Sequence, residues 1–95
     1  MSYYFITQIK IKDEIEYQKY LDKSKNIFTK FNGEYLSVDN APVILEGKWD
    51  YTRTVLIKFN SKTDFEDWYN SIEYQVILKY RLNAADCDTL LIKGL

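Results

Sequence analysis

The sequence predicts an α+β protein in which a four-stranded antiparallel sheet carries two helices on one face. Stretches rich in aromatic and β-branched residues alternate with stretches in which apolar residues recur every three or four positions. Their order is strand, helix, strand, strand, helix, strand, which is the order of the ferredoxin-like βαββαβ fold. Right-handed crossovers then place both helices on the same face of the sheet. With 95 residues the chain can build one core, so a single domain over residues 1–95 is expected.

The first strand and the first helix have clear boundaries. Residues 3–11 (YYFITQIKI) are typical of a strand. Asp13 and Glu16 then form a capping-box pattern that starts a helix, and Asn32-Gly33 ends it. The apolar stripe of this helix consists of Tyr17, Tyr20, Leu21, Ser24, Ile27, Phe28 and Phe31.

The middle of the chain predicts a second and a third strand. Residues 34–38 (EYLSV) form a short strand that is broken at residues 39–42 (DNAP). Residues 43–49 (VILEGKW) are predicted to resume that strand, and residues 50–52 then turn the chain. Residues 53–59 (RTVLIKF) form the next strand, so a tight hairpin is expected here.

The last third predicts two helices and a strand. Ser61 caps a short helix, and Asn70 or Ser71 starts another that runs to about Ala85. Residues 89–92 (TLLI) form the final strand. One side of the longer helix carries Tyr74, Ile77, Leu78, Arg81 and Leu82.

The strands also predict a partner for the sheet. Residues 3–6, 55–57 and 90–92 are apolar at consecutive positions, as in strands that are buried on both faces. Two helices can cover only one of those faces. A second copy of the sheet is the simplest cover for the other face, so we expect a homodimer joined through sheet faces, a dimeric α/β barrel.

Composition excludes several classes of function. The 13 basic and 14 acidic residues nearly cancel and form no basic stripe, so nucleic-acid binding is not expected. No apolar stretch is long enough to cross a bilayer, and Cys87 is the only cysteine, so a cytoplasmic protein without membrane contact is expected. The chain has no histidine, which argues against a protein-bound metal, a haem and Ser-His-Asp catalysis. We expect no cofactor.

Several linked motifs, in a fixed order, extend over nearly the whole chain. They are Asn32-Gly33-Glu34-Tyr35-Leu36, Leu45-Glu46-Gly47-Lys48-Trp49 with Arg53, the strand ending at Phe59, Trp68-Tyr69-Asn70-Ser71 with Glu73-Tyr74-Gln75, and Arg81 with Ala84-Ala85-Asp86. With them the sequence resembles a bacterial family known only as a domain of unknown function, number thirteen-thirty, in the dimeric α/β-barrel superfamily. The resemblance implies a homodimer whose two sheets pack into a barrel, and it implies no assigned activity. The superfamily includes cofactor-free oxygenases, lactone isomerases, haem enzymes and ligand sensors, so the fold does not determine the function.

Glu46 and Arg53 are the first candidate site residues. They flank residues 47–52 symmetrically, so a tight hairpin that turns over these residues would place them opposite each other. One interpretation is a cross-strand ion pair that stabilises the hairpin by about 0.2–1 kcal/mol. The other is a guanidinium, held by a carboxylate at the mouth of a cavity, that binds an anion.

Four further residues are candidates for ligand binding. Arg81 lies within an apolar helix stripe, so it either extends its head to water or is a buried cation that needs a carboxylate partner. Trp49 and Tyr74 are candidates for the wall of a pocket, although helical spacing also explains Tyr74 as a core residue. Gln8 on the first strand either points into the barrel or faces solvent or the dimer seam.

These features leave two functional hypotheses. The first is a dimeric module that binds a small molecule and has no catalytic activity. The second is a cofactor-free enzyme, similar to a monooxygenase or an isomerase, that acts on a small planar or lactone-type metabolite. In that case an arginine would hold an anionic group, and a tyrosine or Glu46 would move a proton. The sequence contains no recognisable pair of nucleophile and base, which favours binding.

Overall fold

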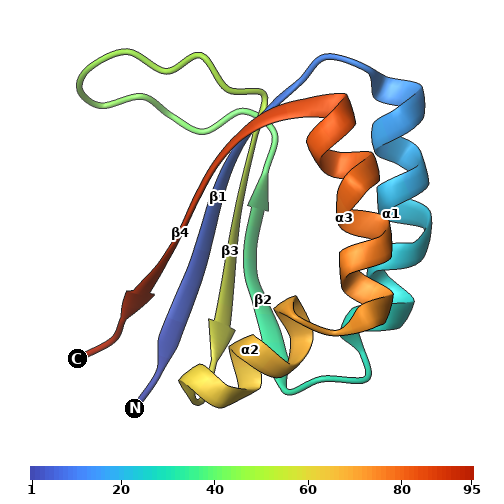
Figure 1. Ribbon diagram of the computed structural model, residues 1–95. Helices are drawn as coiled ribbons and strands as arrows, with labels where there is room; N and C mark the ends of the chain where they lie inside the picture. Colours follow the sequence, from blue (N-terminus) through green and yellow to red (C-terminus); the bar gives the residue numbers. More distant parts are fainter.

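The computed structural model describes residues 1–95 and shows the predicted α+β, ferredoxin-like arrangement (Figure 1). The strands form one antiparallel sheet in the order β2-β3-β1-β4, and the helices lie on one side of it. None of the helices is long and apolar enough to span a membrane. The elements are β1 (Tyr3–Ile11), α1 (Glu14–Phe28), β2 (Gly33–Asp39), β3 (Arg53–Phe59), α2 (Lys62–Tyr69), α3 (Ile72–Ala84) and β4 (Ala85–Lys93).

The three helices begin where the sequence predicts. The Asp13 carboxylate accepts a hydrogen bond from the Glu16 amide at 3.0 Å, and the Ser61 hydroxyl accepts one from the Asp64 amide at 3.0 Å. Of the two alternatives for α3, the structure selects Ser71, whose hydroxyl accepts from a backbone amide of the first turn. Each cap satisfies a backbone N–H group that has no partner inside its helix.

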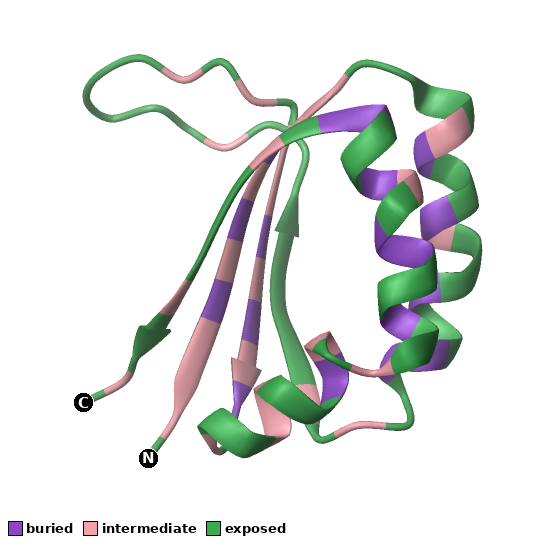
Figure 2. Cartoon of the chain, in the orientation of Figure 1, coloured by how far each residue is buried: buried purple, intermediate pink, exposed green.

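Alternate residues of the central strands β1 and β3 face the helices. Along these strands buried positions alternate with half-buried ones, as Figure 2 shows. Phe5 and Ile9 of β1 are buried on the covered face, while Ile6 and Gln8 lie on the open face. This strict alternation, with a period of two residues, is what a sheet with one covered face requires.

An aromatic cluster fills the space between the sheet and the helices. Trp68 is 1% exposed and lies with its ring centroid 5.3 Å from Phe5 and 4.2 Å from Tyr74. The rings of Phe28, Phe59, Phe65 and Tyr69 also lie around the indole. Trp68 and Tyr74 are therefore core residues, and for Tyr74 this confirms the core position that its helical spacing indicates.

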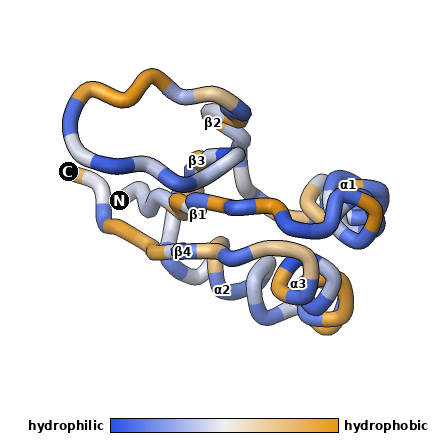
Figure 3. Tube along the Cα trace, turned by 90° about the horizontal axis from the view of Figure 1, so that it is seen from above, coloured by the Kyte–Doolittle hydropathy of each residue, from blue (hydrophilic) through white to orange (hydrophobic).

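The prediction that residues 43–49 resume a strand is wrong. Asp39 at the end of β2 pairs with Thr54 near the start of β3, so the pairing of β2 with β3 is complete before residue 43 is reached. They belong instead to a long loop, residues 40–52, in which Val43 and Leu45 are 84% and 88% exposed. Figures 1 and 3 show this loop, with its apolar stretch, on the side of the sheet away from α1 and α3.

The last strand is longer than predicted. It begins at Ala85, directly after α3, and not at Thr89. Residues 86–88, expected to be a break, continue the pairing of β4 with Gln8, Ile9 and Lys10 of β1. Asp86 and Asp88 are typical of a loop in the sequence. In the structure their side chains are exposed on the edge strand β4, so they do not interrupt the strand.

Candidate functional site

A cavity of about 30 Å³ lies between the covered face of the sheet and the helices. Its wall combines apolar side chains of β1 and β3 with several polar side chains. Both arginines of the chain, Arg53 and Arg81, line it. The other polar side chains in its wall are Thr7, Tyr17, Tyr20, Ser24 and Tyr35.

Arg81 is the most unusual residue in this wall. The last turn of α3 carries it on the helix face that packs against the core, where it is 2% exposed. Its Nε and Nη1 atoms are buried and have no hydrogen-bond partner. Its guanidinium carbon lies 5.7 Å from the centroid of the Tyr20 ring. Two buried guanidinium nitrogens without partners are costly, because their lost hydrogen bonds to water are not replaced.

Burial by itself lowers the pKa of Arg81, because the charged form is desolvated. The phenol oxygens of Tyr74 and Tyr20 act in the opposite direction and outweigh burial, so the net pKa shift is upward. Arg81 therefore remains a cation at every ordinary pH.

Arg53 approaches the cavity from the sheet. It is the first residue of β3, and its Nη1 atom donates a hydrogen bond of 3.2 Å to the Asn40 side-chain oxygen. Its guanidinium carbon lies 6.0 Å from the centroid of the Tyr17 ring, and its Nε atom is buried without a partner. Arg53 is half-buried, so this side chain connects the interior with the surface.

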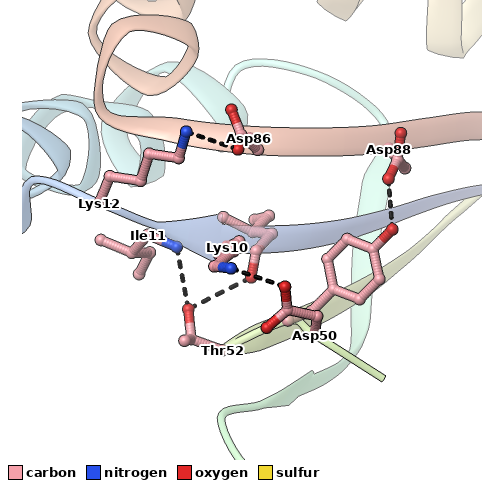
Figure 4. Close-up of polar contacts among 9 residues, drawn as sticks. Lys10, Ile11, Lys12, Asp50, Thr52, Asp86 and Asp88 are labelled. Carbon is pink, nitrogen blue, oxygen red and sulfur yellow. Dashed lines mark hydrogen bonds and ion pairs between the residues drawn. The ribbon is translucent and has the colours of Figure 1, made fainter. Parts of the chain in front are cut away.

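The position of Arg53 depends on contacts of the preceding loop residues with β1 (Figure 4). The Thr52 hydroxyl accepts a hydrogen bond from the Ile11 amide at 3.0 Å and donates one to the Ile9 carbonyl at 3.2 Å. The Lys10 ammonium contacts the Asp50 carboxylate at 2.6 Å. These contacts hold the end of the loop against β1 immediately before Arg53.

The tyrosines around the cavity are hydrogen-bond donors at neutral pH. The hydroxyls of Tyr20 and Tyr74 lie 2.8 Å apart in a buried hydrogen bond. Burial raises the pKa of Tyr17, of Tyr20 and of Tyr74, and it raises the pKa of Tyr35 to about 12. These phenols therefore stay protonated and cannot act as bases near neutral pH.

An outer pocket of about 300 Å³ adjoins the cavity. Both hollows share Tyr17, Leu21 and Arg53 as wall residues, so these three side chains separate the inner space from the surface. The outer pocket also contacts Glu14 and Asn40.

The structure brings together only part of the predicted site. Arg53 and Arg81 line one cavity, and Tyr74 lies behind it, bonded to Tyr20. The predicted pairing of Glu46 with Arg53 is wrong, because Glu46 lies on the exposed loop and the hydrogen-bond partner of Arg53 is Asn40.

Three of the predicted residues lie away from the cavity. Glu46 and Trp49 line a separate hollow of about 320 Å³ that the loop forms with its own residues. Gln8 lies on the open face of the sheet, between Thr54 of β3 and Asp88 of β4. No group of three histidine, cysteine or acidic side chains is placed to hold a metal ion.

Sequence reasoning did not identify Tyr17, Tyr20 and Tyr35 as parts of the site. Tyr17 and Tyr20 belong to the predicted apolar stripe of α1, which makes them look like ordinary core residues. A signal was present, since a tyrosine in a core stripe brings a hydroxyl that needs a buried partner.

The family described as Domain of unknown function (DUF1330) matches residues 2–95. A search of curated proteins finds no match. Among solved structures, the chain is similar to a protein of unknown function from Rhodopseudomonas palustris, with a TM-score of 0.81 and 17% identity over 99% of this chain and 82% of that one.

Two other solved structures are similar at lower identity. A dimeric ferredoxin-like protein of unknown function from Jannaschia sp. CCS1 gives a TM-score of 0.75 and 9% identity over 99% of this chain and 100% of that one. SnoaB, a cofactor-independent oxygenase from Streptomyces nogalater, gives a TM-score of 0.70 and 8% identity over 99% of this chain and 93% of that one. At these identities the likeness shows a shared ferredoxin-like fold.

Proposed function

The chain belongs to the DUF1330 family, and on that premise we propose that it is a homodimeric module that binds a small molecule between its sheet and its helices. The dimer would use the open face of the sheet, and the binding site would be the cavity on the covered face. Each half of this proposal depends on a different observation and has its own test.

The dimer is supported by an apolar row across the open face. Ile6 of β1 is paired with Leu56 of β3 on one side and with Leu90 of β4 on the other, so the three side chains stand next to one another. Leu90 is 55% exposed, and Ile92 beside it is 44% exposed. A second copy would remove this row from water. Similar solved structures from Jannaschia sp. CCS1 and Thermobifida fusca are described as dimeric.

Light scattering of the purified protein tests the dimer. We expect twice the 11.4 kDa chain mass at micromolar concentration. Ile6→Glu and Leu56→Glu should each give the monomer mass, because a carboxylate at the centre of an apolar interface is desolvated without a partner. Val76→Glu is the matched control, since Val76 is 56% exposed on α3, far from the open face, and should leave the dimer intact. A monomeric wild type, or dimers in both open-face variants with folding intact, would contradict the proposal.

Small-molecule binding is supported by one observation: Arg81 is 2% exposed, lines a cavity and has two N–H-bearing nitrogens without partners. Buried polar groups in stable proteins have partners, so something other than this chain is expected to bind these nitrogens. The protonated state of the surrounding tyrosines favours binding over catalysis, because general-base chemistry near neutral pH needs an acceptor of protons.

Native mass spectrometry of the gently purified dimer tests the proposed binding of a small molecule. We expect a retained small molecule, released on denaturation, in the wild type. The Val76→Glu protein should retain it equally. A protein that is purified without any molecule, and whose melting temperature does not respond to a library of small metabolites, would overturn the binding proposal.

A further inference from the structure

The inner cavity has a net positive wall. The chain contains two arginines and eleven lysines, and both arginines line this one cavity. No aspartate or glutamate is among its wall residues. The ion pairs in the structure, such as those of Lys10, Lys12, Lys19 and Lys30, all use lysine, so neither guanidinium has a carboxylate partner in its own chain.

We propose that this cavity is the receptor for the carboxylate group of a small organic acid, with Arg81 as the fixed contact at its inner end and Arg53 as the contact at its mouth. The inference rests on the proposed small-molecule binding and names the class of ligand. The buried Nε and Nη1 atoms of Arg81 have lost their hydrogen bonds to water, and the oxygens of an anionic ligand would replace those bonds.

The free donors can bind an anion. In Arg81, Nε and Nη1 have no partner. These two nitrogens do not form the parallel fork that Nε and Nη2 present to a carboxylate, so each would donate a separate charge-assisted hydrogen bond. Arg53 offers its Nε atom in addition. Tyr17 and Tyr20, both protonated, line the same space and can donate hydroxyl hydrogens to an anion.

The volumes of the inner cavity and of the outer pocket indicate which part of the ligand each would hold. About 30 Å³ is close to the space of one water molecule, so the inner cavity admits only a small flat group. The remainder of the ligand would occupy the outer pocket of about 300 Å³, which is reached between Tyr17 and Arg53. Because Arg53 is held by a single 3.2 Å hydrogen bond to Asn40, it can turn toward an entering carboxylate.

A buried water molecule is the alternative occupant. Water can accept hydrogen bonds from Nε and Nη1, and its size fits the inner cavity. It cannot neutralise two guanidinium charges. The two occupants therefore differ in a measurable way, since only a charged ligand should bind in preference to its neutral analogue of equal shape.

Nuclear magnetic resonance provides the test, because a chain with two arginines gives two Nε–Hε signals. We would titrate the dimer in low-salt buffer with acetate and benzoate, with the neutral analogues acetamide and benzamide, and with inorganic phosphate. We expect benzoate and acetate to shift the Arg81 signal saturably, with at least tenfold higher affinity than their amides and than phosphate. Arg53→Met should lower the affinity for benzoate at least tenfold. Lys79→Met removes the same charge from the exposed side of α3 and should leave the affinity unchanged.

Each other result overturns the inference in a recognisable way. Equal binding of amides and carboxylates would show a small-molecule site that does not select anions, so the proposed function would stand and the ligand class would be wrong. Tighter binding of phosphate would also refute the carboxylate. No binding of any probe, with the Arg81 signal unshifted, would refute both the ligand class and the site. Equal loss of affinity in the Arg53 and Lys79 variants would show a general charge effect only.

Discussion

Replacement of Arg81 by methionine should make the ligand-free protein more stable. The substitution removes Nε and Nη1, two buried groups without partners, each of which costs about 1–3 kcal/mol. It also removes the contact between the guanidinium and the Tyr20 ring, which stabilises the fold by ~2 kcal/mol when desolvated. The net change in the free energy of unfolding is then a gain of between zero and about 4 kcal/mol, with methionine filling most of the same volume.

Urea denaturation at a fixed protein concentration, in buffer without organic anions, measures this change. Arg81→Lys is the control, because it keeps a buried charge and should be less stable than Arg81→Met. Saturating benzoate should then raise the melting temperature of the wild type but not that of the methionine variant. One unpaired buried group costs at least about 1 kcal/mol. A methionine variant that is less stable than the wild type by more than that amount would refute the reasoning. Arg81 would then have a structural partner in its own chain.

Three further predictions concern the core around the site. Gly33→Ala should lower the free energy of unfolding by about 1–3 kcal/mol in a urea titration, because a Cβ atom would lie 2.5 Å from the Phe28 ring and 2.7 Å from the Phe59 ring; an unchanged midpoint would show that these rings move aside. Tyr20→Phe should cost about 1–2 kcal/mol by leaving the Tyr74 hydroxyl unpaired, and the double variant with Tyr74→Phe should cost less than the sum of the single ones; strict additivity would contradict the coupling. Stability should be complete below pH 10 and fall above it, because unfolded tyrosines ionise near pH 10 whereas burial raises the pKa of Tyr20 and Tyr74 in the fold. A decline of about 1.4 kcal/mol per pH unit for each such tyrosine is expected, and a flat profile of denaturation midpoints between pH 10 and 11.5 would disprove it.

The fold could be predicted because local signals and long-range pairing agree over most of the chain. Asp13, Ser61 and Ser71 mark helix starts through a single local hydrogen bond, which the sequence records directly. The loop of residues 40–52 misled the prediction, because Val43, Ile44 and Leu45 have the composition of a strand. Strand formation also requires a free neighbouring strand, and β3 is already paired with β2 and β1.

The sequence allowed us to predict the two arginines of the candidate site, but not the residues that surround them in the fold. Arg81 stood out because a cation in an apolar helix stripe must be explained, and the structure shows it buried. Arg53 also stood out, but the assumption of a tight hairpin gave it Glu46 as a partner. Its actual neighbours, Asn40 and Tyr17, come from a long loop and from α1. That arrangement depends on the register of the sheet and on how α1 packs across it, neither of which is a local property of the sequence.

Strand β3 serves both proposed surfaces through the alternation of its side chains. Arg53, Val55 and Ile57 face the cavity, while Thr54 and Leu56 face the open side of the sheet. A dimer would fix the backbone of β3 from the open side, and Leu56 stands only three residues from Arg53. Formation of the dimer should therefore restrict the position of the cavity mouth without any contact between the partner and the ligand. Leu56→Glu, if monomeric and folded, should for this reason bind benzoate more weakly than the wild type, whereas Val76→Glu should bind it equally. Equal affinity in the monomer would show that the two faces of the sheet act independently.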